Sequence, residues 1–228
     1  MCGRITQQMT VTYYSNILGM RIKDVDEPLY RDPIGNYNAG PGARQWVLRR
    51  DEDANVLPEQ LAWQWLSPWA KEKKMKPAIN AKLEKLLGAY YRGLMKSGRI
   101  VVPADGWFEW TAEDGGKQPW YIKPKDGQPL FLAGLTDLRP GVEGDAGSGF
   151  VIVTNESAGG MVDIHDRRPV ALLPEDARDW LDLGFDYKQA EMIARERSLP
   201  VDVFEWYRVS RDVNGSRMRD AHLIEPIG

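Results

Sequence analysis

Cysteine and histidine are scarce in this chain of 228 residues, which contains one Cys and two His. A single Cys excludes a disulfide within the chain, and these few residues cannot supply an ordinary structural zinc site. We therefore expect neither a bound metal nor another cofactor. Any thiol or imidazole chemistry must use Cys2, His165 or His222.

Long apolar segments are also absent from the sequence. No apolar run approaches the roughly 20 residues that a helix needs to cross a bilayer. Arg4 follows Met1 closely, and no apolar segment of the length found in signal peptides comes after it. These absences predict a cytoplasmic protein with no membrane partner.

The chain has little excess of charge, with a formal net charge of −3. That value argues against a protein that coats nucleic acid non-specifically, although it leaves a local basic groove open. Arg167 and Arg168 are adjacent, and further Arg residues gather between positions 208 and 219. Each group is either part of such a groove or a solvated charged face.

The composition is ordinary for a globular protein, with 43% apolar and 28% charged residues. We find no internal repeat and no long linker, and the Gly-rich, acidic stretch at 140–149 has the character of an exposed loop. The sequence therefore predicts a single domain over residues 1–228, which we expect to be a monomer.

Strand patterns dominate the middle of the chain, and helical patterns surround them. Strands are predicted at 99–102, 107–111, 120–122, 130–135, 150–154 and 203–209, with hairpin turns at 103–106, 115–116 and 126–127. Helices are predicted at 81–97, 174–181 and 187–197. The combination predicts an α+β fold with a mainly antiparallel sheet flanked by helices.

Cys2 is the most informative residue for chemistry. Removal of an initiator Met is favoured before a small residue, and it would leave Cys2 with an α-amine and a thiol on adjacent carbons. Both groups are partly in their nucleophilic forms near neutral pH. Such a 1,2-aminothiol condenses with an aldehyde to an imine and then closes to a thiazolidine. The alternative is a Cys that packs as a small apolar side chain.

Two further residues are candidates for proton transfer. Glu109 lies in a run with three aromatic residues (106–110) and on a strand would share a face with Trp107. It is either a desolvated acid–base group with a raised pKa or a carboxylate on a solvent face. His165 lies in a polar segment with Asp166 and two Arg. It is either a proton shuttle or a surface residue.

Asn80 and a Trp cluster are candidates for contacts with an anionic ligand. Asn80 precedes the predicted helix at 81–97, where it would be an N-cap or help to receive a phosphate, with Lys82 adding charge. Trp63, Trp65 and Trp69 either stack on bases or pack in the core.

The sequence resembles the SOS-response-associated peptidase family. The resemblance rests on five motifs in the family's order, at residues 1–4, 37–42, 79–82, 102–110 and 164–169, which span nearly the whole chain. It implies a single α+β domain with a barrel-like sheet and a basic cleft. The family usually has Arg at the position of Lys82. Lys keeps the positive charge there but loses the bidentate phosphate contact that Arg can make.

The resemblance also implies a function, a covalent crosslink to abasic sites in single-stranded DNA. Cys2, freed of Met1, would be the nucleophile, and Asn80 would position its amine. Glu109 would be the acid–base catalyst, and His165 would assist opening of the sugar ring. DNA contacts would come from Arg4, Lys82, Trp69 and Arg167.

Other functions remain open at this point. A thiol peptidase would use Cys, His and Glu, with the Met1–Cys2 bond as its expected substrate. A non-covalent binder of single-stranded or modified DNA would use the Trp and Arg residues. A lyase that cleaves the abasic strand is a variant of the first hypothesis, because an imine at Cys2 also acidifies the neighbouring sugar proton.

Overall fold

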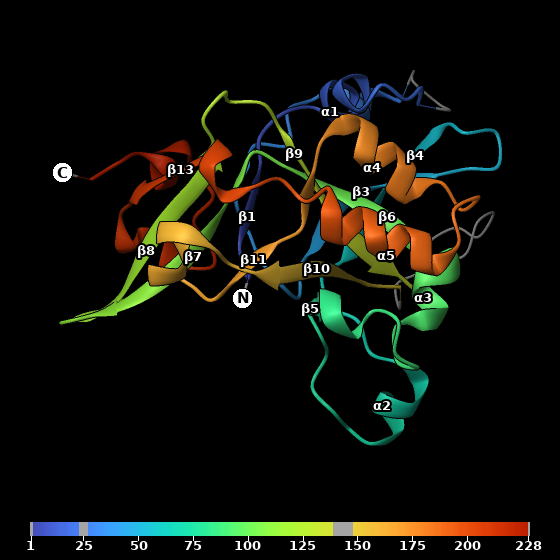
Figure 1. Ribbon diagram of the computed structural model, residues 1–228. Coiled ribbons are helices and arrows are strands. Elements are labelled where there is room, and N and C mark those ends of the chain that lie inside the picture. The colour runs from blue at the N-terminus through green and yellow to red at the C-terminus, as the bar shows by residue number, and fades with distance from the viewer. Residues whose placement is uncertain (1, 23–26, 139–147, 228) are drawn as a thin grey trace.

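A computed structural model describes residues 2–22, 27–138 and 148–227 of the chain. Within these ranges, no helix is both long and apolar enough to pass through a lipid bilayer. These described residues form two β-sheets with a layer of helices (Figure 1).

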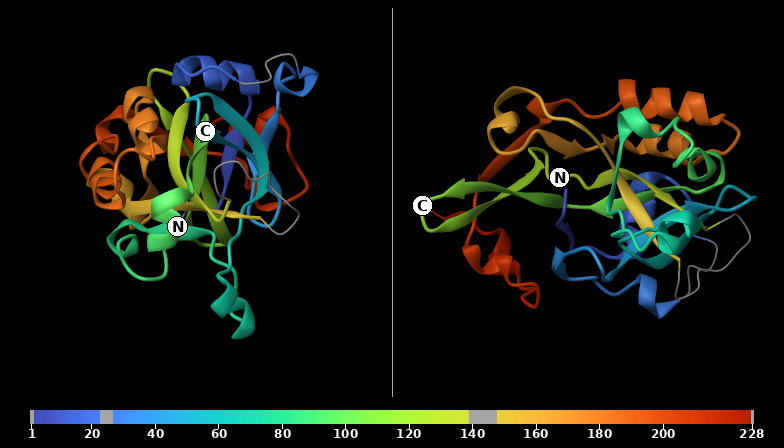
Figure 2. Two further views of the ribbon diagram at one scale, coloured as in Figure 1. Left: turned by 90° about the vertical axis from the view of Figure 1, so that its right-hand side faces the viewer. Right: turned by 90° about the horizontal axis from the view of Figure 1, so that it is seen from below.

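The smaller sheet has five strands in the order β13-β8-β7-β1-β2, and all neighbours are antiparallel. Its strands are β1 (Ile5–Gln7), β2 (Asn36–Ala39), β7 (Gly106–Glu113), β8 (Gly116–Pro124) and β13 (Phe204–Arg208). β7 and β8 form a long hairpin that extends from the body of the molecule (Figure 2).

The larger sheet has eight strands, six of which follow the order β11-β10-β9-β6-β3-β4. These six are β3 (Arg44–Arg50), β4 (Val56–Ala62), β6 (Arg99–Ala104), β9 (Leu130–Thr136), β10 (Phe150–Glu156) and β11 (Arg167–Pro169). The other two are β12 (Ala171–Leu172), which pairs with β9, and β5 (Asn80–Lys82), which pairs in parallel with β10.

The helices begin and end where the local sequence favours it. They are α1 (Val11–Leu18), α2 (Pro68–Glu72), α3 (Arg92–Ser97), α4 (Pro174–Leu181) and α5 (Tyr187–Glu196). The described residues also form the 3-10 helices η1 (Pro28–Tyr30), η2 (Leu83–Lys85), η3 (Gly159–Asp163), η4 (Val201–Val203), η5 (Arg211–Asn214) and η6 (Ala221–Ile224). Pro174 opens α4, and Asp186 and Gln189 form a capping box that starts α5.

Side chains that alternate along the strands of the larger sheet build a core on each of its faces. On β10, Val151 and Val153 pack with α1, α4 and α5, whereas Phe150 and Ile152 pack against the smaller sheet. Burial of both faces explains why the central strands β6 and β9 are almost entirely apolar. A third cluster, around Phe108, lies on the opposite face of β7. The core around Phe150 and Ile152 therefore lies between the two sheets.

Most of the predicted elements are confirmed. The α+β class and its mainly antiparallel pairing hold, and strands or helices occupy all the predicted segments except 81–97. The turn at 115–116 closes the β7–β8 hairpin. The segment at 140–147 lies outside the described residues.

Two predicted hairpins were wrong, at 103–106 and 126–127. At both places the chain leaves one sheet and enters the other, since β6 and β9 pair with each other while β7 and β8 pair in the smaller sheet. Turn residues favour a reversal of direction, but they do not determine which strand becomes the partner.

The predicted helix at 81–97 was also wrong. Residues 80–82 form β5, and only 92–97 are α-helical. Parallel pairing with β10 overrides the helical spacing, because it buries Ala81 beside Val153. Asn80 is therefore a strand residue and not an N-cap.

Gly106, at the first of the two crossings, has no room for a side chain. A Cβ atom there would lie 2.5 Å from the Tyr121 ring and 2.6 Å from the Ile122 carbonyl oxygen. We expect Gly106→Ala to lower the free energy of unfolding by about 1–3 kcal/mol, measured by urea denaturation, because it overpacks this contact.

Gly93→Ala is the matched control for this prediction. Nothing lies within 4 Å of a Cβ atom at Gly93, which is inside α3, so Ala should leave stability unchanged or raise it. Equal stability of the two variants would contradict the proposed close contact at Gly106.

Candidate active site

Cys2 lies in the core between the two sheets, just before β1. Its side chain is fully buried, in a cluster that includes Trp107 and Ile152. β1 is held there by pairing with β7, where Ile5 faces Trp107. Burial raises the pKa of the Cys2 thiol well above its ordinary value, and the Glu109 carboxylate adds to this. The thiol therefore holds its proton at neutral pH.

Glu109 points into the same layer from β7. Strand alternation places Trp107 and Glu109 on the inner face of the smaller sheet, while Phe108 packs on the outer face. Glu109 is only 2% exposed, so the solvent-face alternative was wrong. Burial raises the pKa of its carboxyl to about 7. A carboxyl with this pKa can both donate and accept a proton near neutral pH.

His165 approaches Glu109 from the segment that precedes β11. Its Nε2 lies 4.0 Å from Glu109 Oε2, and its side chain is 28% exposed. The backbone N–H of Arg167 donates to His165 Nδ1 at 3.0 Å, and Asp166 Oδ1 lies 2.8 Å from the same nitrogen. Burial lowers the pKa of the imidazole, which favours its neutral form.

Asn80 completes this group from β5. Its Nδ2 donates to the Cys2 carbonyl oxygen at 2.9 Å. Its Oδ1 is buried and has no hydrogen-bond partner among the described residues. The structure thus brings Cys2, Asn80, Glu109 and His165 together from four separate segments of the chain.

Arg4 lies beside this group, on an open cleft of about 400 Å³. Gly3, Trp110, Lys117 and Asn214 line the cleft with it. The Arg4 guanidinium lies 5.9 Å from the centre of the Trp110 ring, and Trp110 Nε1 donates to Asn214 Oδ1 at 2.7 Å. A basic and aromatic cleft of this kind suits a nucleic-acid strand.

Trp110 and Lys117 were not among the predicted DNA contacts. Trp110 stood in the motif at 102–110, but its place beside Arg4 depends on the pairing of β1 with β7, where Phe108 N–H donates to the Arg4 carbonyl. Lys117 reaches the cleft through the β7–β8 hairpin. Sequence spacing carried no signal for either position.

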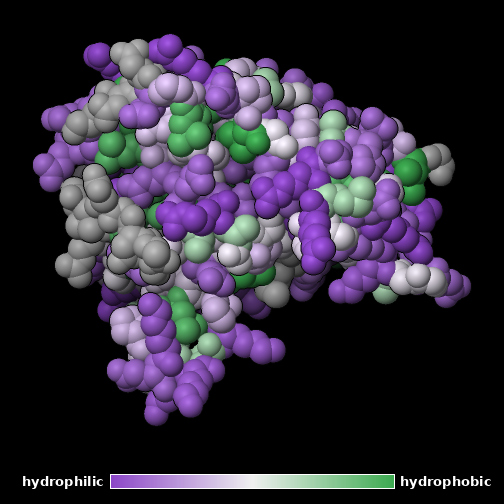
Figure 3. Space-filling model, turned by 180° about the vertical axis from the view of Figure 1, so that it is seen from behind, coloured by the Kyte–Doolittle hydropathy of each residue, from purple (hydrophilic) through white to green (hydrophobic). Residues whose placement is uncertain are grey.

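The other predicted contacts differ in exposure. Lys82 is exposed on β5, two residues after Asn80. Trp69 is 56% exposed on α2, whose segment projects from the body with a mostly hydrophilic surface (Figure 3). Trp63 and Trp65 are buried in the core, so of that cluster only Trp69 is available to a ligand.

Arg167 is not exposed in this way. Its guanidinium donates to both carboxylate oxygens of Glu84, at 3.1 and 3.0 Å, and to the Thr154 carbonyl at 2.7 Å. Its side chain is 7% exposed. The guanidinium is therefore already occupied by protein acceptors.

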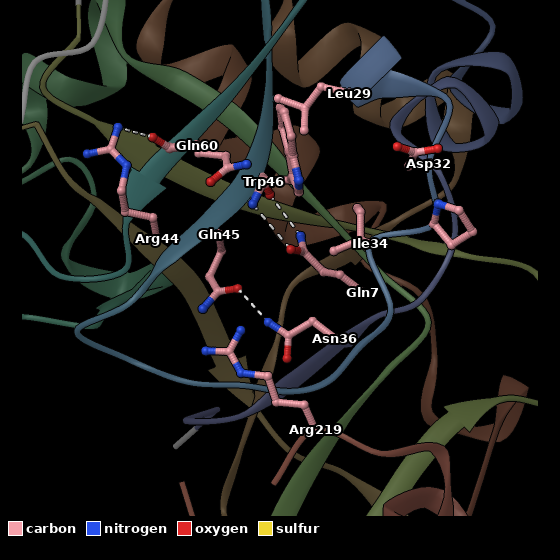
Figure 4. Close-up of a pocket in the computed structure, with 11 residues that line it drawn as sticks. Gln7, Leu29, Asp32, Ile34, Asn36, Arg44, Gln45, Trp46, Gln60 and Arg219 are labelled. Atoms are coloured by element: carbon pink, nitrogen blue, oxygen red, sulfur yellow. Dashed lines mark hydrogen bonds between the residues drawn. The ribbon is translucent and has the colours of Figure 1, made fainter. Parts of the chain in front are cut away.

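A separate pocket of about 270 Å³ lies near the far end of β1 (Figure 4). Gln7 donates there to the backbone carbonyls of Trp46 and Pro103, at 2.8 and 2.9 Å, and Asn36 donates to Gln45 at 3.3 Å. The Gln7 amide ties β1 to β3 and β6, and Asn36 ties β2 to β3. The Gln7 contacts hold one end of β1, and Cys2 lies just before the other end.

Comparisons with known proteins find relatives that match most or all of the chain. The chain is 39% identical to the abasic site processing protein YedK of Escherichia coli, over the whole length of both. It is 33% identical to the abasic site processing protein YoqW of Bacillus subtilis, over 83% of this chain and 85% of the relative. Among solved structures, a phage-related protein of Bordetella bronchiseptica is 41% identical, with a TM-score of 0.75 over 92% of this chain and 95% of that one.

The family model for SOS response associated peptidases matches residues 1–216. That match includes Cys2, Asn80, Glu109 and His165, the four residues that the fold brings together, and it covers nearly the whole chain. This protein belongs to the SOS response associated peptidase (SRAP) family.

Proposed function

We propose that this protein recognises abasic sites in single-stranded DNA and crosslinks to them covalently through Cys2, once Met1 has been removed. The observation that carries the proposal is the convergence of Glu109, His165 and Asn80 on the one Cys of the chain. Two relatives that share 33–39% identity with it are named abasic site processing proteins.

The proposed reaction starts at the α-amine of Cys2. The amine adds to the aldehyde carbon of the ring-opened sugar, and the resulting carbinolamine loses water to give an imine. The thiol then adds to the imine carbon and its proton moves to the nitrogen, which closes a five-membered thiazolidine. One water leaves in the overall reaction, and no oxidant or cofactor is needed.

The environment of the four residues supports this order of steps. Because the buried Cys2 thiol keeps its proton, the amine is the better first nucleophile. Glu109, with a pKa of about 7, can protonate the departing hydroxyl and afterwards accept the thiol proton. Asn80 Oδ1 is a buried acceptor close to Cys2, suited to orient the amine. His165 would assist opening of the sugar ring.

DNA would bind as a single strand along the cleft at Arg4 and Trp110, to one protein monomer. Lys82 and Trp69 would add a phosphate contact and a stacking surface. Non-covalent binding is then the first step of the same reaction, and it should weaken with salt.

Cleavage of peptides in general is less well supported by the site. A cysteine peptidase needs a thiolate activated by His, whereas the Cys2 thiol is buried and holds its proton. We limit peptidase activity to removal of Met1. Strand cleavage by β-elimination is a side reaction of the imine, and ring closure to the thiazolidine suppresses it.

The test uses single-stranded DNA with one abasic site. Wild-type protein should give a band of protein and DNA that survives denaturing electrophoresis without any reductant. The control DNA carries a tetrahydrofuran in place of the abasic sugar, so it has the same shape but no aldehyde, and it should give no band. Equal bands from the two DNAs, or none from the abasic strand, would refute the proposal.

A further inference from the structure

We propose that Arg167 is a positioning residue, whose ion pair with Glu84 holds the Asn80 strand and the His165 segment together and keeps the proton of neutral His165 on Nε2. The assignment differs from the phosphate contact implied by the family resemblance. Its kinetic consequence rests on the proposed function, whereas its effect on His165 does not.

The ion pair is anchored on both sides. Glu84 lies in η2, directly after β5, and accepts two hydrogen bonds from the Arg167 guanidinium in a bidentate arrangement. A third bond from the same guanidinium reaches the Thr154 carbonyl on β10. The buried guanidinium pulls the pKa of the Glu84 carboxyl below its ordinary value, against the opposing effect of burial.

These contacts join strands that do not pair with each other. Thr154 of β10 pairs with Lys82 of β5 and also with Pro169 of β11, so β10 lies between the two. Asn80 lies on β5, and His165 precedes β11 by two residues. The Arg167–Glu84 pair therefore spans β10 and connects the two segments that supply these site residues.

The backbone of Arg167 acts directly on the imidazole. Its N–H donates to His165 Nδ1 at 3.0 Å, and a ring nitrogen that accepts a hydrogen bond carries no proton. The proton of the neutral ring is then on Nε2, the atom that lies 4.0 Å from Glu109 Oε2. Arg167 thus provides both the side-chain anchor to Glu84 and the backbone hydrogen bond that sets the tautomer of His165.

Asp166 offers the competing arrangement. Its Oδ1 lies 2.8 Å from His165 Nδ1 and would favour a proton on that nitrogen. The Asp166 side chain is 82% exposed, so water competes for it, whereas Arg167 is buried and fixed by three acceptors. If the Arg167 side chain is released, a larger fraction of neutral His165 should carry its proton on Nδ1, facing Asp166.

Three variants separate positioning from phosphate binding. Glu84→Gln removes the charge of the partner, and Arg167→Lys keeps the positive charge but loses the bidentate geometry. Asp179→Asn is the matched control, because it breaks an ion pair with Arg197, at 2.8 Å, between α4 and α5, neither of which supplies a residue of the site.

The first readout is the ¹⁵N chemical shifts of the imidazole nitrogens. The chain has only two His, and the signals that His222→Gln removes identify His222 and leave His165. We expect Nε2–H in wild type and in Asp179→Asn, and a mixture of the two tautomers in Glu84→Gln and Arg167→Lys.

The second readout compares affinity with rate. Affinity for tetrahydrofuran-containing single-stranded DNA should change less than about twofold in both test variants, whereas crosslinking of abasic DNA should slow by about tenfold to a hundredfold through misplacement of the site residues. A phosphate role predicts the reverse, with stronger binding in Glu84→Gln and weaker binding in Arg167→Lys.

An unchanged His165 tautomer in both test variants would overturn the proposal, as would stronger DNA binding by Glu84→Gln. If wild type gives no crosslink, the proposed function fails, but the tautomer measurement still decides the role of Arg167. Thermal unfolding of each variant identifies loss of the fold as a separate cause.

Discussion

Glu109→Gln is expected to slow adduct formation by about 10²–10⁴-fold, the range that a positioned acid–base group contributes. Gln fills nearly the same volume and accepts hydrogen bonds, but it cannot transfer a proton. Affinity for tetrahydrofuran-containing DNA should remain near that of wild type, since Glu109 is buried at the reacting end of the site. The measurement is the single-turnover rate of crosslinking to one abasic site.

The pH dependence of the rate gives a sharper form of the same prediction. At low pH the α-amine is protonated, and above the Glu109 pKa of about 7 the acid that expels water is lost. The wild-type rate should therefore pass through a maximum between about pH 7 and 8. In Glu109→Gln the alkaline decrease should disappear. A variant that keeps both the wild-type rate and its decrease would exclude Glu109 as the acid.

Glu109→Gln should also change stability with pH. Burial raises the folded-state pKa of the carboxyl from 4.5 to about 7, so the folded state binds the proton more tightly. The resulting stabilisation is complete below about pH 4.5 and is lost as pH rises through about 7. Relative to the variant, wild type should lose up to about 3 kcal/mol of its free energy of unfolding between these limits.

Cys2→Ala is expected to abolish the adduct that survives denaturation, because Ala has an amine but no thiol to close the ring. The amine still forms an imine, so borohydride should trap a crosslink with this variant. Strand cleavage at the abasic site should rise above the wild-type level, since no ring closure competes with elimination. Denaturing gels, run with and without borohydride, measure all three effects.

The matched control for Cys2→Ala is a second position in the same core. Ala39→Ser places a hydroxyl in the layer that contains Cys2 and leaves the chain with both the amine and the thiol of Cys2. It should retain a crosslink that needs no reductant. A reductant-independent adduct with Cys2→Ala, in the wild-type amount, would contradict the role of the thiol.

The placement of Glu109 was within reach of sequence reasoning, and that of its partners was not. Alternation along one strand put Glu109 on the face of Trp107, which the fold confirms. Which face of β7 is buried between the sheets depends on how the two sheets pack. A pattern within one strand carries no information about that packing. The proximity of His165 to Glu109 likewise depends on contacts between distant segments.

Asn80 and Arg167 illustrate the limits of local patterns in opposite ways. Asn80 was selected as a helix cap, and it reaches Cys2 from a strand that pairs in parallel with β10. Arg167 was selected for its charge, and that charge is already matched by Glu84 inside the fold. In contrast, α4 and α5 were predicted well because Pro174 and the Asp186 capping box are local signals.

Intact-mass measurement of the protein, before and after treatment with abasic single-stranded DNA, tests the central claim most directly. Before treatment, the reactive fraction should have the mass of the chain without Met1. After treatment, that fraction alone should gain the mass of the DNA less one water, as closure of a thiazolidine at Cys2 requires. Two results would contradict the account: an adduct on chains that retain Met1, or an adduct whose Cys2 thiol still reacts with iodoacetamide.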